Sequence, residues 1–340
     1  MTFNSIFKNN LIIIFALLPL LVFSQNDSSL PFEPQKLIKP SYLKAGDTIA
    51  IVAPSGVIKE TEPIEKAKLL AESWGLHVLV GKNVFVTNFH FSGTDEQRRE
   101  DFQNALDNKS VKAIWCARGG YGSVRIIDAL DFSNFKAVPK WIVGYSDITV
   151  LHNHLHNLGY ETLHAMMPIN MKTEEIELTN TISTFKNALF GEKVTYKIDT
   201  SPLNTKGTFK GQLVGGNLSI LQSVLGSSTT INTTGKILFL EEVSEPLYKI
   251  DRMLYSLKRS GYFNNIAGLI IGDFSDIKEN LITPYGKTLE EIIIEATKEY
   301  SFPIIFNVAA GHKVENNALF LGREVEIKVC KEKTTIRFSE

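Results

Sequence analysis

A serine, two carboxylates and a histidine each stand at the end of an apolar stretch of this sequence. Ser146 follows KWIVGY, Glu241 and Glu242 close GKILFLEE, and His312 follows FPIIFNVAAG. A serine hydroxyl needs a neighbouring base to become a nucleophile, and the base needs an acid to orient it. Two alanines and a glycine before His312 leave space around it. These residue types make acyl transfer through a serine the chemistry to test.

The stretch around Ser146 is by itself ambiguous. A nucleophile elbow reads G-x-S-x-G at a turn from strand to helix, whereas this chain has Ile148 at the last position. The hydroxyl of a serine at a helix start also caps the helix by accepting a backbone N–H. Taken alone, the stretch favours a cap over a nucleophile. Glu241 and Glu242 also have a purely structural interpretation, as acidic residues where a strand ends at the protein surface.

Two further turns follow apolar runs in the first half of the chain, Ala53-Pro54-Ser55-Gly56 and Arg118-Gly119-Gly120-Tyr121-Gly122. Closely spaced glycines let the backbone approach a ligand and leave free amides pointing at it. Neither turn matches a phosphate-binding fingerprint. Ligands of open parallel sheets gather beyond the carboxyl ends of the strands. We therefore expect both turns to lie beside the turn that carries Ser146.

The remaining histidines and the cysteines carry weaker signals. His152 and His156 share a helix face, but without a third ligand we expect solvated surface rather than zinc, and no metal or other cofactor is expected. We expect His164 to lie either in the core or at the functional site, and His90 to lie in a loop. Two cysteines make no disulfide framework. Cys116 is expected to be a buried thiol, and one bridge to Cys330 is possible.

Strand-like and helix-like segments alternate in the first half of the chain, which predicts parallel strands with crossover helices. We expect an α/β fold with a doubly wound parallel sheet, of the Rossmann or flavodoxin type, over residues 43–168. A connecting segment, 169–209, leads to a smaller mixed α/β domain with antiparallel strands, 210–340. The chain of 340 residues is 44% hydrophobic and has a net charge of -1. No basic field is present to attract nucleic acid.

The first 25 residues differ from the rest. Lys8 precedes an apolar run from Leu11 to Phe23, and small and polar residues follow. This pattern predicts a secretory signal peptide over 1–25, since a membrane span needs about 20 apolar residues. Residues 26–42 are expected to be a linker. The mature protein is expected to be exported, to the periplasm, with no membrane span, and an uncleaved membrane anchor is the alternative.

Seven blocks of the sequence, spread over both halves, resemble the LD-carboxypeptidase family of serine peptidases, which also contains the microcin C self-immunity proteins. They are GDTIAIVAPSG, CARGGYGSVRIIDALDF, PKWIVGYSDITVLH, GQLVGGNLSIL, ILFLEEVSEPLYKIDRML, GLIIGDF and GHKVENNALFLG. The resemblance implies a metal-independent hydrolase with Ser146 as nucleophile, Glu241 as triad acid and His312 as base. It implies backbone N–H groups of Gly120 and Asp147 as oxyanion donors, a cleft between the two domains, and a homodimer.

The implied substrate is a murein tetrapeptide, cleaved at its L,D-peptide bond with release of terminal D-Ala. Arg118 is a candidate for the terminal carboxylate, with a structural ion pair as the equal alternative, and Gly119 and Tyr121 are expected beside the substrate. Two features depart from the family pattern. Glu241-Glu242 replaces Glu-Asp, so the two acids could exchange roles. His164-Ala165-Met166-Met167-Pro168 replaces His-Gly-Pro, and we expect this change to reshape the wall of the cleft.

Two alternative functions stay open. One is a peptidase or amidase on another small peptide conjugate, like the microcin-immunity branch. The other is a non-catalytic periplasmic binding protein of two α/β domains. A binding protein has no need of Ser146, Glu241 and His312 together.

Overall fold

The computed structural model describes residues 36–280 and 282–340. The predicted signal peptide, residues 1–25, lies outside the described residues, as do residues 26–35 of the predicted linker. In the described part of the chain, no helix is both long and apolar enough to cross a membrane.

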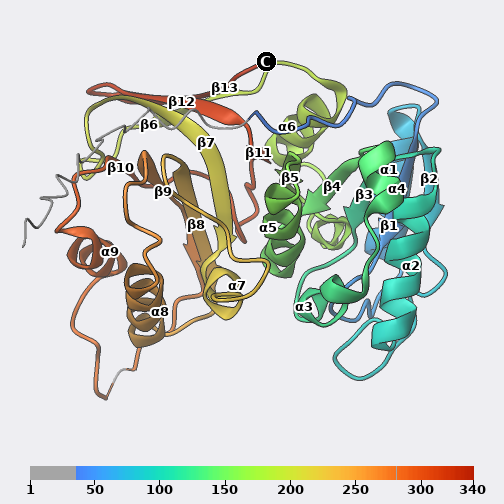
Figure 1. Ribbon diagram of the computed structural model, residues 1–340, viewed down its shortest axis with the longest axis horizontal. Helices are drawn as coiled ribbons and strands as arrows, with labels where there is room; N and C mark the ends of the chain where they lie inside the picture. The colour runs from blue at the N-terminus through green and yellow to red at the C-terminus, as the bar shows by residue number, and fades with distance from the viewer. Residues whose placement is uncertain (1–35, 281) are drawn as a thin grey trace, which may run out of the picture. The chain divides into compact units, whose positions relative to one another are not determined.

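The first sheet of the described chain is mostly parallel and has the order β11-β5-β4-β3-β1-β2 (Figure 1). All neighbours pair in parallel except β11, which pairs with β5 in antiparallel fashion. The sequence 2-1-3-4-5 is that of flavodoxin-like doubly wound folds, so the predicted class is confirmed. The strands are β1 Thr48–Val52, β2 His77–Val80, β3 Val111–Cys116, β4 Trp141–Gly144, β5 Thr162–His164 and β11 Leu319–Leu321. The helices between them are α1 Glu62–Ser73, α2 Asp95–Asp107, α3 Ser123–Ile126, α4 Ser133–Ala137 and α5 Thr149–Asn157.

The second sheet is mixed, as predicted, with the order β10-β9-β8-β7-β12-β13-β6. Strands β10, β9, β8 and β7 run parallel, and β12, β13 and β6 add antiparallel ladders. The strands are β6 Thr195–Asp199, β7 Gly207–Asn217, β8 Ile237–Val243, β9 Gly268–Ser275, β10 Ile304–Ile305, β12 Glu324–Val329 and β13 Lys333–Phe338. The helices are α6 Thr179–Phe190, which precedes the sheet, and α7 Leu218–Ser223, α8 Leu247–Arg259 and α9 Leu289–Thr297.

Two strands belong to a sheet that their predicted segment of the chain did not indicate. β6 falls within the predicted connecting segment but forms one edge of the second sheet. β11 falls within the predicted second domain but pairs with β5 of the first sheet, Leu319 opposite His164. A single cut along the chain therefore does not separate the two sheets, and the predicted domain boundaries stay a prediction.

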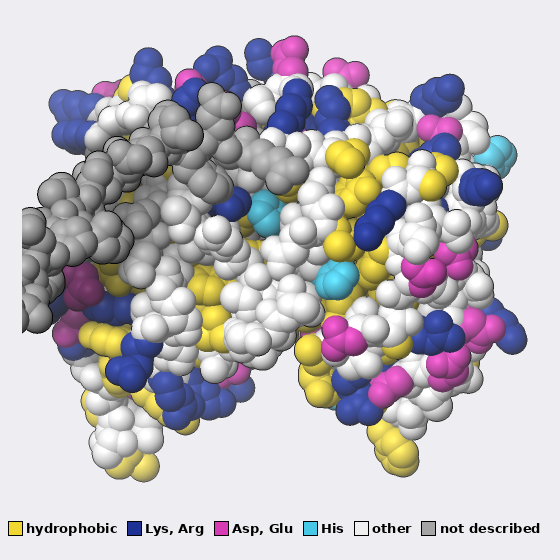
Figure 2. Space-filling view, in the orientation of Figure 1, with side chains coloured by type: hydrophobic (Ala, Val, Ile, Leu, Met, Phe, Trp, Pro, Cys, Tyr) yellow, Lys and Arg dark blue, Asp and Glu magenta, His cyan; other side chains and the backbone are white. Residues whose placement is uncertain are grey.

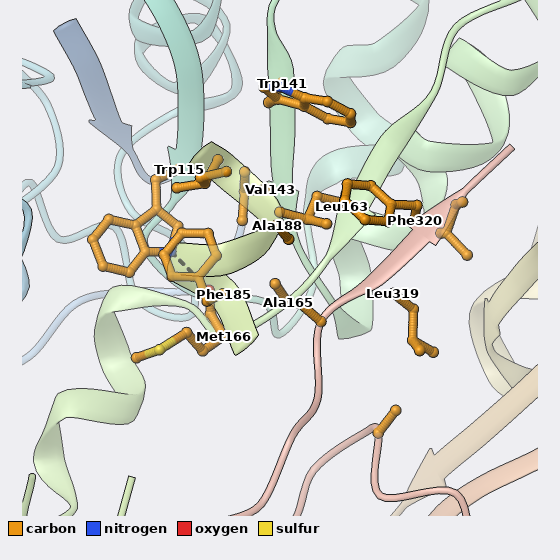
Figure 3. Packing of buried hydrophobic residues seen from close by; sticks show 14 of the residues in the cluster. Trp115, Trp141, Val143, Leu163, Ala165, Met166, Phe185, Ala188, Leu319 and Phe320 are labelled. Carbon is orange, nitrogen blue, oxygen red and sulfur yellow. Dashed lines mark hydrogen bonds between the residues drawn. The ribbon is translucent and has the colours of Figure 1, made fainter. Parts of the chain in front are cut away.

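Buried aromatic residues hold the first sheet to the elements around it. Figure 3 shows the rings of Trp115 on β3 and Phe185 on α6 facing each other, with their centroids 5.0 Å apart. The indole N–H of Trp115 donates to the carbonyl of Met166 at 2.7 Å, so the one polar atom of this ring is satisfied. The same cluster continues through Phe320 on β11 to Phe239 on β8. One continuous core therefore supports both sheets. On the face in Figure 2, charged side chains of both signs are interspersed.

Candidate active site

Ser146 lies at the turn between β4 and α5. Its φ is +64°, a left-handed conformation that is uncommon for a residue with a side chain. Capping residues normally have extended backbone, and their side chain accepts a bond from the first helical turn. Ser146 lacks the extended backbone, and its hydroxyl makes no such bond in the described structure. The geometry is that of a strained turn that presents a hydroxyl, so it favours the nucleophile over the cap.

Glu241 and His312 form a hydrogen-bonded pair. Nδ1 of His312 lies 2.6 Å from Oε2 of Glu241, whose side chain is fully buried. Glu241 sits where the pairing of β8 with β9 shifts register, and such an irregularity re-aims a side chain. Gly311 has a φ of +141°, and a Cβ there would lie 3.1 Å from Oε2 of Glu241. A glycine before His312 therefore lets this loop come close to the buried acid.

The charges around His312 favour its protonated form. Burial lowers the pKa of the imidazole, but the nearby carboxylates of Glu241, Glu242 and Asp273 outweigh burial, so the pKa is raised above its usual value. The ring of Tyr145 packs edge-on against His312 at 4.9 Å between centroids. His312 is thus held by a carboxylate on Nδ1 and by an aromatic wall, which leaves Nε2 as the ring nitrogen free to exchange a proton.

Glu242 has a different set of partners. Its carboxylate accepts a hydrogen bond from Asn217 Nδ2 at 3.1 Å. It also accepts from the backbone N–H groups of Ser219 and of the next residue, Val243, both at 2.8 Å. Burial raises the pKa of Glu242, and these hydrogen bonds act against that rise. Glu242 anchors the start of α7, and Glu241 is the acid that contacts the histidine.

The glycine turn lies directly against Ser146. A Cβ on Gly119 would lie 2.9 Å from Ser146 Oγ and 3.3 Å from the backbone nitrogen of Asp147. Within the described residues, the backbone N–H groups of Gly119 and Gly120 donate to no acceptor. Unpaired amides beside a serine hydroxyl can bind an oxyanion. Gly120 lines the same cavity as Ser146, and the role of Gly120 and Asp147 as oxyanion donors stays a prediction.

Asp147 joins the three turns that we expected to meet. Its Oδ2 accepts from the hydroxyl of Ser55 at 2.6 Å and from the backbone N–H of Ser123 at 2.8 Å. A backbone bond from Gly56 to Gly119, 3.0 Å long, ties the first turn to the second. Burial raises the pKa of Asp147, and the two hydrogen bonds act against that rise. A buried carboxylate thus fixes the turn that carries Ser146.

Ser146 and His312 line the same cavity, of about 340 Å³. Arg118, Gly119 and Gly120 line it as well, and Arg118 donates to the carbonyl of Val57 at 2.7 Å. Tyr121 does not line it. Its exposed ring packs on His90 and Phe91 instead. Other lining residues that sequence reasoning did not single out are Tyr145, Asn217, Ser219 and Glu245.

The prediction that His152 lies on a solvated helix surface is wrong. Its side chain is buried, and its Nε2–H donates to the carbonyl of Gly144 at 2.9 Å. Burial lowers the pKa of His152 to about 4, so the ring is neutral. This bond anchors the end of β4, two residues before Ser146. His164 is buried in the core against Tyr145 and Phe239 rather than in the cavity wall.

Both cysteines lie in the described part of the chain. Cys116 is a free buried thiol, as expected, and Cys330 is free and exposed, so the two form no bridge. Among residues 36–280 and 282–340, no group of three or more His, Cys, Asp and Glu side chains is placed to hold a metal ion.

Comparison with known proteins extends over both sheets. The LD-carboxypeptidase N-terminal domain profile matches residues 49–165, and the LD-carboxypeptidase C-terminal domain profile matches residues 210–327. The chain is 34% identical over 305 residues to a probable murein peptide carboxypeptidase of Bacillus subtilis, across 88% of this chain and 93% of that protein.

Solved structures agree with the sequence matches. The muramoyltetrapeptide carboxypeptidase of Oxalobacter formigenes has a TM-score of 0.79 at 26% identity, over 86% of this chain and 99% of that chain. The wild-type microcin C7 self immunity protein MccF has a TM-score of 0.80 at 21% identity, over 88% of this chain and 98% of that chain. The second likeness is one of fold.

Proposed function

The chain belongs to the LD-carboxypeptidase family of serine peptidases, and on that premise we propose that it hydrolyses the L,D-peptide bond of murein tetrapeptides and releases terminal D-alanine. Because the chain belongs to a hydrolase family, we do not keep the alternative of a non-catalytic binding protein. The observation that carries the proposal is the 2.6 Å contact between His312 and buried Glu241, on a cavity that Ser146 shares.

In the proposed mechanism His312 acts first as a base. Its Nε2 takes the proton of Ser146 as Oγ attacks the scissile carbonyl, and Glu241 holds Nδ1–H and stabilises the imidazolium. The oxyanion of the tetrahedral intermediate accepts from the backbone N–H groups of Gly120 and Asp147. In comparable enzymes the loss of one such donor costs about 3 kcal/mol.

Collapse of that intermediate breaks the bond to D-alanine. His312 gives its proton to the departing amine, and an ester remains between Ser146 and the shortened peptide. A water molecule then attacks the ester as His312 takes its proton. The bond to Oγ breaks, His312 returns the proton to Ser146, and the product acid leaves. We assign the carboxylate of the D-alanine to Arg118, because Arg118 lines the cavity that contains Ser146.

The location of the reaction is part of the proposal. Muropeptides are present outside the cytoplasm, so the predicted signal peptide over residues 1–25 fits this substrate. The predicted homodimer is likewise part of the proposal.

The test uses protein lacking residues 1–25 and three peptides: the tetrapeptide, the same peptide ending in L-alanine, and the tetrapeptide with an amidated C-terminus. We expect mass spectrometry to show loss of one alanine from the first peptide alone. Absence of any loss from folded protein contradicts the proposal. Hydrolysis of another small peptide conjugate in its place would establish the alternative branch of the family.

A further inference from the structure

The lining of the cavity that contains Ser146 carries charges of both signs. Arg118 comes from the glycine turn after β3, whereas Glu242 and Glu245 come from the end of β8 and the turn that follows it. A ligand that fits this arrangement has a carboxylate at one end and a cation at the other.

Glu245 is the carboxylate of the two that has capacity for a ligand. Glu242 already accepts three hydrogen bonds from the protein. Glu245 Oε2 makes no hydrogen bond with any described residue, and its one ion pair is with Lys249, at 3.2 Å. The side chain of Lys249 is 41% exposed, and that of Glu245 is 27% exposed.

An ion pair of this kind is readily exchanged. The two side chains are four residues apart and only partly exposed, and ion pairs at this spacing near the protein surface contribute little to stability. A cationic group that enters the cavity can replace Lys249 at the Glu245 carboxylate. The protein pays little for the exchange, since Lys249 returns to solvent.

We propose that the substrate residue before the scissile bond is a diamino acid and that Glu245 binds its side-chain ammonium group, so that the enzyme selects substrates that carry a free amine there. This inference rests on the proposed function. The diamino acid supplies the acyl half of the scissile bond, and D-alanine with its carboxylate is the leaving half. The two charges of the substrate therefore lie on opposite sides of the scissile bond, and Glu245 and Arg118 supply charges of opposite sign in the cavity that contains Ser146.

The test compares two tetrapeptides, one with a free side-chain amine on the third residue and one with that amine acetylated. We expect the wild type to show a kcat/KM about tenfold higher for the free amine, the size typical of a hydrogen bond to a charged group. In Glu245→Gln this ratio falls to about one, mainly through KM. In Lys249→Gln the ratio rises, because the carboxylate loses its competitor.

Glu299→Gln is the matched control. Glu299 has an exposed side chain in an ion pair with Lys258 at 2.8 Å and does not line the cavity, so the same change in charge leaves the ratio unchanged. A Glu245→Gln protein that keeps the wild-type ratio overturns the inference, as does an equal change in Glu299→Gln.

A binding measurement distinguishes a failure of this inference from a failure of the proposed function. Titration calorimetry on Ser146→Ala, with and without Glu245→Gln, measures the preference for the free amine without any turnover. A preference that depends on Glu245 in a protein with no wild-type hydrolysis contradicts the proposed function alone. Hydrolysis with equal binding of the two peptides contradicts the inference about Glu245 alone.

Discussion

His312 and Glu241 are 71 residues apart in the sequence, and Nδ1 of the histidine lies 2.6 Å from Oε2 of the acid. Because that contact occupies one ring nitrogen, we propose that the other one serves Ser146. Glu242, the next residue, contacts α7 instead. The adjacent acids therefore have separable roles, and isosteric changes distinguish them.

Glu241→Gln should lower activity strongly while the protein stays folded. The amide keeps the shape of the side chain but favours the wrong tautomer of His312, and in a comparable triad such a change lowers kcat about 10⁴-fold. Glu242→Gln should mainly lower stability, by about 1–3 kcal/mol, because buried amide donors lose a charged acceptor. Urea unfolding and kcat measure the two effects. Equal loss of activity without loss of stability in Glu242→Gln would contradict this assignment.

The pH dependence of the rate should report His312. The neutral ring is the base, and the nearby carboxylates raise its pKa, so kcat/KM should rise with pH through a midpoint above the usual value of 6.5. Glu241→Gln removes the largest of the charges that raise this pKa, and its residual activity should have a midpoint at lower pH. An acidic limb that does not move in Glu241→Gln would count against His312 as the base.

Gly119→Ala should abolish activity. The new methyl group would lie 2.9 Å from Ser146 Oγ and 2.8 Å from Ser146 Cβ, so either the turn or the serine must move. A shift of this kind at a reacting atom costs about 10²-fold or more in rate.

Gly226→Ala is the comparison for Gly119→Ala. Gly226 has a φ of +80° and open space around it, so the variant should lose about 1 kcal/mol of stability and keep its activity. Normal turnover by Gly119→Ala would show that the glycine turn does not abut the reacting centre.

Asp147→Ala should lower both stability and activity. It leaves the Ser55 hydroxyl and the Ser123 amide buried without their acceptor, at about 1–3 kcal/mol each. Ser55→Ala removes one partner of the same carboxylate and should cost about 1 kcal/mol. The denaturant midpoints and the kcat/KM values of the two variants show whether Asp147→Ala has the larger effect. Asp147→Ala unfolding no more easily than Ser55→Ala would contradict the anchoring role.

The alternation of apolar and amphipathic segments was enough to predict the first sheet, because each parallel strand and its crossover helix have local signals. Two strands escaped that reasoning. β11 is a short segment, Leu319–Leu321, whose partner β5 lies more than 150 residues earlier, and local pattern carries no information on such pairing. β6 likewise joins the second sheet through β13, near the end of the chain.

The sequence was enough to predict which residue types stand at the strand ends of the candidate site. It was less able to predict which of these side chains contact one another. Sequence could not choose between Glu241 and Glu242, because a register shift in β8 decides which one reaches His312. His152 was misjudged because polar residue types suggested an exposed helix face, whereas the helix packs that face against β4. Glu245 had one available signal, since it lies four residues before Lys249 in the block that also carries Glu241.

The most direct test is the turnover of Ser146→Ala on the murein tetrapeptide, measured beside the wild type as alanine released over time. The hydroxyl of Ser146 is the atom on which the whole mechanism depends. We predict D-alanine release by the wild type and a loss of at least about 10³-fold in the variant, with an unchanged unfolding midpoint. Release by Ser146→Ala at the wild-type rate would contradict the assignment of the nucleophile and the serine mechanism built on it.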